Sequence, residues 1–378
     1  MYELYCMSYD LLLCILISPL TPFIYAYNFF YKKALANPKD GDAFDICMDV
    51  LKKNASELGI LASPNEYTDV WTRDSFFALM GLEHVGVDAK QTTVETLEKF
   101  QREDGLIPLY VGRGDACAKL VCKAKAEGPV KATYGDSKTG NVVTDSCFQF
   151  IIMRGSPSGS PSGSGSDTDK SKLAWDFMSR YVKNGLIFEK GLGSWMDTVY
   201  HEGYVLYTNV LYYKAAEVMG YDTSVIKRRI YEELWNGEYF YCSSTIPSFD
   251  QVGNALAVRW GLQKPDTIVA YRKKHFRKGL SNPPCLPMVD NIYWPCYMIG
   301  NQMYHNFGWT WVNLLFISIM EDDGELELFK KEIERRGVYE IYDGPEPVNQ
   351  LFCVSQSDFS EAAGMYLLCS DRKYTYLV

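Results

Sequence analysis

The chain has 378 residues and a formal net charge of −9, and 47% of its residues are hydrophobic, including 28 Tyr and 8 Trp. The acidic balance argues against a nucleic-acid partner, because neutralising phosphates requires a basic surface. Eleven scattered Cys form no CxxC pair and four His show no HxxxH spacing, so we expect neither a metal site nor a cofactor. The thiols are expected to be buried and reduced, which indicates a cytoplasmic location.

The N-terminal 40 residues contain an uncharged run, residues 11–30. Its length is close to that of a membrane-spanning helix, but Pro19 and Pro22 would kink such a helix. The residues before the run include no Lys or Arg, which a signal peptide requires. We therefore predict that residues 1–40 form an apolar arm packed against the outside of the main domain. A membrane anchor through residues 11–30 and a cleaved signal peptide are the alternatives.

Beyond residue 40, helical periodicity alternates with loops that carry Gly, Pro, Asn or Asp, and no β-rich region is evident. The pattern predicts helices over Ala43–Ala55, Thr72–Leu82, Gln91–Gln101, Asp145–Arg154, Lys170–Val182, Gly203–Met219, Thr223–Leu234, Asp250–Leu262, Asp266–Phe276, Asn301–Met320, Glu325–Arg336 and Gln356–Leu368.

Twelve helices make six hairpins, and the closed arrangement of six hairpins is an all-α fold, the (α/α)6 barrel or six-hairpin toroid. We expect residues 41–378 to form this single domain. The Gly/Ser/Pro run within residues 155–169 predicts a flexible surface loop. A linker between two domains is the alternative, but helical periodicity continues on both sides of the run. The inner helices should follow long polar-aromatic loops, as they do before Phe76, Phe148, Tyr204 and Phe307.

Five clusters combine Trp or Tyr with polar and charged residues. They are Tyr67–Asp74, Gln101–Pro108 with the later Thr144 and Asp145, Ser194–Asp197, Tyr304–Trp311 and Tyr339–Gly344.

The first two clusters offer contacts to a sugar. Arg73 and Asp74 can form paired hydrogen bonds to vicinal hydroxyls while Trp71 stacks on a sugar ring. The alternative is an ordinary helix N-terminus, with Asp74 favourably placed in the first turn. Asp104 is consistent with an ordinary turn and Asp145 with a helix cap, and each is equally consistent with a sugar contact.

The third and fifth clusters supply carboxylates that are far apart in sequence. Asp197 follows Trp195 and Met196, and burial beside them would raise its pKa towards neutrality, as a general acid requires. Glu340 and Asp343 lie in a turn-like segment whose alternative interpretation is a solvated acidic turn. Hydrolysis of a glycosidic bond requires two such carboxylates, one protonated and one ionised.

The fourth cluster brings Tyr304, His305 and Asn306 before Trp309 and a second tryptophan. Buried His and Asn side chains need hydrogen-bond partners, which the rim of a sugar pocket would supply. A core histidine with Asn306 as a helix cap is the alternative.

In this order, the clusters resemble the (α/α)6 glycosidases of the amylo-α-1,6-glucosidase, neutral invertase and processing α-glucosidase kind, over about residues 60–368. The Thr72–Asp74 run is similar to the segment that binds the sugar in the −1 subsite. The Ser194–Asp197 run resembles an S/T-W-M-D motif whose Asp is the general acid. The Glu340–Gly344 run resembles an E-x-Y/F-D-G motif whose Glu is the general base. Ser355–Ser357 is similar to the start of the last inner helix.

The resemblance implies an inverting, exo-acting glycoside hydrolase for α-glucosides or related oligosaccharides, with Asp197 as general acid and Glu340 as general base. The substrate-binding residues that it implies are Trp71, Arg73, Asp74, Asp104, Asp145, Trp195, Tyr304, His305, Asn306, Trp309, Asp343 and Gln356. Phe307 occupies a position where the family usually has Gly, which keeps a non-catalytic carbohydrate-binding relative as one alternative. A sugar 2-epimerase with paired histidines on the same barrel is the other.

Overall fold

The computed structural model describes residues 41–64, 67–85, 89–113, 129–136, 139–155, 169–290, 292–293, 304–320, 323–349 and 353–370. Residues 1–40 and nearly all of the Gly/Ser/Pro run lie outside these ranges, so the predictions of an apolar arm and a flexible loop stay predictions. Among the helices of the described ranges, none is both long and apolar enough to cross a membrane.

The described part of the chain contains twelve α-helices, and each overlaps one of the helices that the sequence predicts. They are α3 (Ala43–Asn54), α4 (Thr72–Val85), α5 (Lys90–Lys99), α7 (Ser146–Arg154), α8 (Lys170–Ser179), α9 (Leu206–Val218), α10 (Ser224–Leu234), α11 (Gln251–Arg259), α12 (Pro265–His275), α14 (Thr310–Ile317), α15 (Asp323–Arg336) and α16 (Ser360–Ser370).

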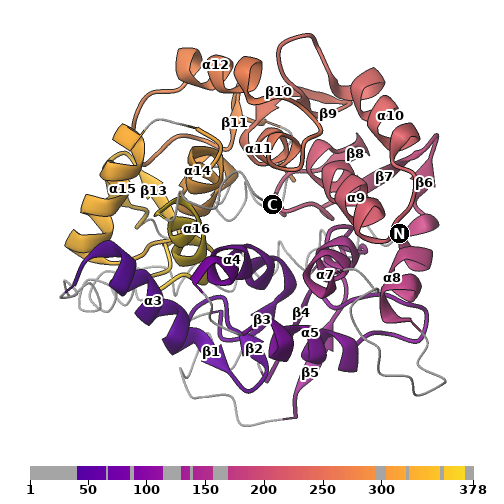
Figure 1. Ribbon diagram of the computed structural model, residues 1–378, viewed down its shortest axis with the longest axis horizontal. Coiled ribbons are helices and arrows are strands. Elements are labelled where there is room, and N and C mark those ends of the chain that lie inside the picture. The colour runs from indigo at the N-terminus through magenta and orange to yellow at the C-terminus, as the bar shows by residue number, and fades with distance from the viewer. Residues whose placement is uncertain are drawn as a thin grey trace, which may run out of the picture.

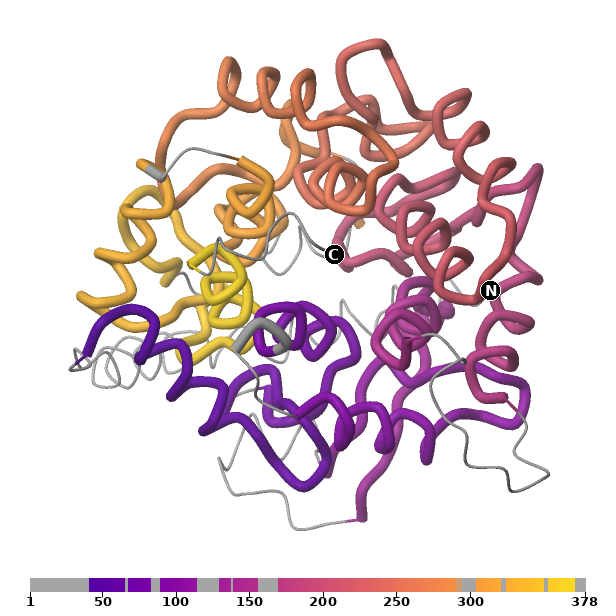
Figure 2. The backbone as a smooth tube through the Cα atoms, in the orientation of Figure 1, coloured from indigo at the N-terminus to yellow at the C-terminus, as the bar shows by residue number. Residues whose placement is uncertain are grey.

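Six of these helices form a closed ring. Helix α4 contacts α7, and the contacts continue through α9, α11, α14 and α16 back to α4. Figure 1 shows these six around the centre of the molecule, with α3, α8, α10, α12 and α15 outside them. In Figure 2 the yellow α16 lies beside the indigo α4, so the last described helix closes the ring against the second. All four helices that the loop pattern assigns to the inside belong to this ring.

Burial explains which helices lie inside. Every residue of α14, Thr310–Ile317, is buried, as expected for a helix that is covered on all sides. Helix α10 instead buries only Ile226, Ile230 and Leu234, which are four residues apart and form one stripe. The outer helices therefore need one apolar face, and the inner helices need apolar residues all round.

The described residues also form five small antiparallel sheets. The sequence does not predict them, because strands of two to six residues carry too little alternation to be recognised. The strands are β1 (Ala55–Ser56), β2 (Gly59–Ile60), β3 (Val70–Trp71), β4 (Tyr110–Gly112), β5 (Lys131–Thr133), β6 (Val182–Lys183), β7 (Leu186–Gly191), β8 (His201–Tyr204), β9 (Tyr241–Ser243), β10 (Ile246–Asp250), β11 (Cys285–Leu286), β12 (Gly308–Trp309), β13 (Ile341–Asp343) and β14 (Glu346–Pro347). β1 pairs with β2, and the other strands form the sheets β3-β4-β5, β6-β7-β8, β9-β10-β11 and β12-β13-β14.

Several of these strands lead directly into inner helices. Trp71 ends β3 immediately before α4, Asp250 ends β10 before α11, and Trp309 ends β12 before α14. The strand β12 is the reason why α14 begins at Thr310, later than predicted: Tyr304–Asn306 form a 3-10 turn and the strand follows it. The polar-aromatic clusters therefore gather where strands enter the N-terminal ends of the inner helices.

Helices α4 and α16 cross backbone to backbone. A Cβ atom added to Gly81 would lie 1.9 Å from the carbonyl oxygen of Gly364, and one added to Gly364 would lie 2.5 Å from the Cα of Ala78. Real Cβ atoms do not approach so closely, so glycine is required at both positions. This crossing brings the first turns of the two helices together.

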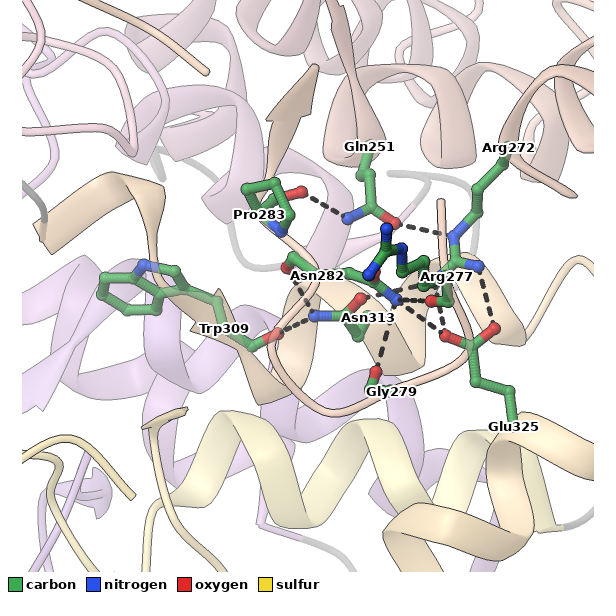
Figure 3. Close-up of polar contacts among 9 residues, drawn as sticks. All are labelled: Gln251, Arg272, Arg277, Gly279, Asn282, Pro283, Trp309, Asn313 and Glu325. Atoms are coloured by element: carbon green, nitrogen blue, oxygen red, sulfur yellow. Dashed lines mark hydrogen bonds and ion pairs between the residues drawn. The ribbon is translucent and has the colours of Figure 1, made fainter. Parts of the chain in front are cut away.

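A buried polar network joins the outer helices α12 and α15 to the inner helices α11 and α14 (Figure 3). The Arg272 guanidinium of α12 donates to both carboxylate oxygens of Glu325 of α15, at 2.8 and 2.7 Å. Its Nε donates to Gln251 Oε1 at 2.9 Å, and Asn313 Nδ2 donates to the carbonyl oxygen of Trp309 at 2.9 Å. Charges buried this deeply require such complete pairing.

Candidate active site

A cavity opens at the end of the ring where the strands enter the inner helices. The described residues that line it are Tyr67, Trp71, Arg73, Asp74, Trp195, Asp197, Tyr304, His305, Trp309, Trp311, Glu340, Phe359 and Glu361. They come from the starts of α4, α14 and α16 and from the segments around residues 195 and 340. Both carboxylates of the hydrolase hypothesis, 143 residues apart in sequence, therefore line one cavity.

Asp197 lies in the loop between β7 and β8, and its side chain contacts an imidazole. His305 Nε2 is 2.9 Å from Asp197 Oδ1. The imidazole is fixed between two indoles: it stacks on Trp309 with an interplanar angle of 6°, and Trp195 meets it edge-on at 5.3 Å. The Asp197 side chain is 45% exposed, so the burial that the sequence predicts is wrong for the protein alone.

Arg73 holds the loop that carries Asp197. Its guanidinium donates to the carbonyl oxygens of Ser194 and Trp195, both at 3.4 Å. The Arg73 Nε donates to Asp145 Oδ2 at 2.7 Å. Burial acts to lower the pKa of Arg73, but the charge of Asp145 opposes it, and the net pKa lies above the usual value. Arg73 therefore remains a cation at the cavity wall.

Asp145 lies behind Arg73 and not on the described lining of the cavity. Its side chain is fully buried, and Tyr207 donates its hydroxyl to the same Oδ2 at 3.1 Å. Gln149 in turn donates to the Tyr207 hydroxyl at 2.8 Å. The prediction of a direct sugar contact by Asp145 is replaced by a role in fixing Arg73.

Glu340 has two hydrogen-bond donors of its own. The Tyr304 hydroxyl donates to Oε1 at 3.0 Å, and the backbone N–H of Gln356 donates to Oε2 at 3.2 Å. Only 2% of Glu340 is exposed. Burial and the charge of Glu340 raise the pKa of Tyr304 well above its usual value, so Tyr304 stays a neutral donor. Both bonds favour the ionised form of Glu340.

Asp74 lines the same cavity but has a different electrostatic environment. Burial raises its pKa to about 7, although the neighbouring Arg73 charge opposes the shift. Asp74 can therefore bind a ligand hydroxyl either as an acceptor or, in its protonated form, as a donor.

Four other predicted contacts do not belong to the described lining. Asp104 is bound to Arg102 and accepts a hydrogen bond from the Leu106 N–H in an exposed turn. This is the turn that the sequence offered as the alternative to a sugar contact. Asn306 bonds to both backbone groups of Val289. Asp343 is exposed on β13.

Gln356, the fourth of them, acts through its backbone. Its N–H donates to Glu340, while its side-chain amide donates to the carbonyl oxygen of Val354. Gln356 therefore lies beside Glu340, and its predicted contact with a substrate stays a prediction.

Four lining residues are absent from the predicted set. Tyr67 and Trp311 belong to clusters that the sequence singled out, so their chemistry was visible. Phe359 immediately precedes α16, and Glu361 lies in its first turn. Both residues are outside every cluster. The available signal was positional: Glu361 sits in the first turn of an inner helix, as Asp74 does in α4.

Within the described residues, no group of three or more His, Cys, Asp or Glu side chains is arranged to hold a metal ion. The six cysteines of the described ranges, Cys47, Cys147, Cys242, Cys285, Cys353 and Cys369, are free and buried.

No protein-family model matches the chain, and no curated protein matches it. Solved structures do match. The GH63 mannosylglycerate hydrolase from Thermus thermophilus, in complex with Tris and D-glycerate, aligns with a TM-score of 0.56 at 14% identity, over 87% of this chain and 100% of that chain. A glycosidase variant aligns with a TM-score of 0.59 at 13% identity, and another variant, in complex with glucose, with 0.57 at 12%. Both cover 88% of this chain and 97% of their own.

These structural neighbours are glycosidases, the class of protein that the sequence motifs resemble. At these identities the likeness is one of fold.

Proposed function

We propose that the protein is an inverting glycoside hydrolase built on an (α/α)6 barrel. The barrel is supported by the closed ring of six inner helices and the outer helices around it. The observation that carries the activity is the single cavity lined by Asp197, Glu340, Arg73 and several indole rings. Two carboxyl groups and apolar aromatic faces are the groups that glycosidic hydrolysis and sugar binding require.

Asp197 is the general acid in this proposal. With its proton on Nε2, the neutral imidazole of His305 donates to Oδ1, which leaves Oδ2 to carry the acidic proton. That proton passes to the glycosidic oxygen as the bond to the anomeric carbon breaks. A bound sugar would cover the exposed face of Asp197 and so supply the burial that a general acid needs.

Glu340 is the general base. It takes a proton from a water molecule whose oxygen attacks the anomeric carbon from the side opposite the leaving group, so the configuration inverts. The donors Tyr304 and Gln356 favour the ionised carboxylate and fix its orientation. The products are the released alcohol and a free sugar of inverted anomeric configuration.

The substrate class in this proposal is a small glycoside that enters a pocket from its non-reducing end, with α-glucosides as the first choice. Trp71 and Trp309 offer faces for a sugar ring, and Arg73 and Asp74 offer hydrogen bonds to its hydroxyls. The neighbouring structures add mannosylglycerate as a second substrate to test, since one of them is a hydrolase of that compound.

The test is a substrate panel followed by NMR of the first product. Aryl glycosides, sucrose, maltose, isomaltose and mannosylglycerate are incubated with the purified protein, and the anomer that appears first is recorded. We expect release of a sugar with inverted configuration. The Asp197→Asn and Glu340→Gln variants should lose turnover by about a thousandfold or more while staying folded.

The matched control is Asp343→Asn, which removes an exposed carboxylate three residues from Glu340. It should keep near wild-type turnover. Normal activity of Asp197→Asn, or retention of configuration, would rule out the mechanism. Binding detected as a thermal shift without any turnover would instead favour the non-catalytic relative.

The epimerase alternative requires a second histidine at the cavity. His201 interacts with His305, but it is completely buried and lies outside the described lining. Burial, followed by the electrostatic interaction with His305, lowers the pKa of His201 to about 4, so His201 stays neutral. Isomerised free sugar in the same panel would identify an epimerase.

A further inference from the structure

Glu361 is a buried carboxyl group that the hydrolytic mechanism does not use. It lies in the first turn of α16, is 3% exposed and lines the cavity. Its Oε1 atom has no hydrogen-bond partner among the described residues. A buried polar atom without a partner costs free energy, so such an atom on a residue that lines a cavity indicates a ligand that completes its bonding.

The packing of α16 on α4 determines where this carboxyl group lies. The close crossing at Gly81 and Gly364 brings the first turn of α16 against that of α4, which carries Arg73 and Asp74. The charges of Asp74, Arg73 and Glu340 all act on Glu361. Its position at the cavity is therefore a consequence of the closure of the ring and not of a local loop.

The charges around Glu361 do not favour its ionised form. Four carboxyl groups line the described cavity, and its one guanidinium, Arg73, is bonded to Asp145. Burial, and then the charge of Asp74, raise the pKa of Glu361 well above its usual value. This environment favours the protonated form of the carboxyl group.

Glu340 and Glu361 thus differ although both are buried glutamates of one cavity. Glu340 receives hydrogen bonds from Tyr304 and Gln356, which suit an anion. Glu361 has no described donor and has carboxyl groups as neighbours. Two titratable groups with such opposite surroundings perform opposite tasks.

We propose that Glu361 is a substrate-binding residue that holds sugar hydroxyls as a neutral carboxylic acid, donating through its O–H and accepting through its carbonyl oxygen. This inference rests on the proposed function in that the cavity receives a sugar. It assigns to Glu361 no proton transfer in the reaction. The residue selects sugars that carry a hydroxyl at the position it faces, since a buried polar group left without its partner penalises the analogue that lacks it.

The test compares two substitutions of the same residue. Glu361→Gln keeps one donor and one acceptor in the same shape, whereas Glu361→Leu removes both. D-glucose is the probe, and its affinity is measured by calorimetry together with that of its 2-, 3-, 4- and 6-deoxy derivatives. Activity on the best glycoside of the panel is measured in parallel.

We expect Glu361→Gln to keep the wild-type affinity and kcat/KM within about threefold, and Glu361→Leu to lose about tenfold or more in both. In the wild type, one deoxy derivative should bind more weakly than D-glucose, and in Glu361→Leu this difference should vanish. If Glu361 only supported the fold, its substitution by Leu would lower the affinity for all the sugars equally. The control is Glu189→Gln, a buried glutamate outside the described lining, which should leave every affinity unchanged.

Three results would overturn the inference. They are a Glu361→Gln variant as inactive as Glu340→Gln, an unchanged deoxy-sugar pattern in Glu361→Leu, and a wild-type protein that binds no D-glucose. Failure of the hydrolase proposal looks different: no glycoside of the panel is cleaved, while the Glu361-dependent pattern of sugar binding persists.

Discussion

Two buried arginines, Arg73 and Arg272, each bind a carboxylate of another helix, but their surroundings differ. Arg272 and Glu325 share two hydrogen bonds, and Gln251, Asn313 and Asn282 make further hydrogen bonds to this pair (Figure 3). Both of their side chains are 2% exposed.

Arg73 makes a single bond to Asp145, contacts two carbonyl oxygens at longer range, and reaches the cavity with 14% of its side chain exposed. Beside it, Asp74 and Glu361 are carboxyl groups with raised pKa values. The first network completes its own hydrogen bonding and so serves stability. The second leaves polar atoms facing a cavity, as a binding site requires.

The largest effect should come from breaking the closed network. Glu325→Ala leaves the Arg272 guanidinium buried without its counter-ion, which should cost roughly 3–5 kcal/mol of unfolding free energy. Denaturant unfolding measures this loss. The control Glu327→Ala removes an exposed member of the same helix and should change stability by no more than about 0.5 kcal/mol. Equal stability of the two variants would show that the network is not structural.

The next test exchanges arginine for lysine in both networks, which keeps the charge but loses the forked geometry. Arg73→Lys can no longer hold the carbonyl oxygens of Ser194 and Trp195, so Asp197 is displaced and turnover should fall by about a hundredfold. Arg272→Lys should lower the melting temperature but leave the kcat of the folded protein near normal. If Arg73→Lys lost stability but kept its turnover, the Arg73 network would serve stability as the Arg272 network does.

A smaller effect is expected where the ring closes. The Cβ atom of Gly364→Ala would meet Ala78, so α16 must shift from α4 at a cost of about 1–3 kcal/mol. Because Glu361 moves with α16, KM should rise as well. Gly279→Ala, whose Cβ would meet nothing within 4 Å, is the control for both measurements. An unchanged KM in a folded Gly364→Ala protein would contradict the link between this crossing and the cavity.

The smallest effect concerns pH. Burial raises the pKa of Glu189 from 4.5 to about 7, although Thr208 and Thr144 oppose the shift. Between these values the folded protein holds a proton that the unfolded chain has lost, so the unfolding free energy falls as the pH rises.

Glu189→Gln removes this dependence. Its melting temperature should equal that of the wild type at pH 4.5 and exceed it by a few degrees at pH 8. The control is Glu202→Gln, at an exposed position on β8. Its melting temperature should differ from that of the wild type by the same amount at pH 4.5 and at pH 8. A Glu189→Gln curve parallel to that of the wild type would show that Glu189 titrates alike in both states.

The sequence alone was sufficient for the helices and for singling out the two carboxylates that line the cavity. Helical periodicity depends on residues a few positions apart, and so do the motifs around Asp197 and Glu340. Short strands depend on distant residues instead, so the sequence could not show them. Strand β12, for example, pairs with β13, which lies more than thirty residues later.

The tertiary structure decided which polar residues meet. Asp145 and Asp74 looked alike in sequence, but one lies behind Arg73 and the other on the cavity wall. Asp104 and Asn306 found local partners, whereas Glu361 entered the cavity because Gly81 and Gly364 let two helices from opposite ends of the described chain touch. Local chemistry is encoded in neighbouring residues, but burial and the sharing of partners exist only once distant helices pack together.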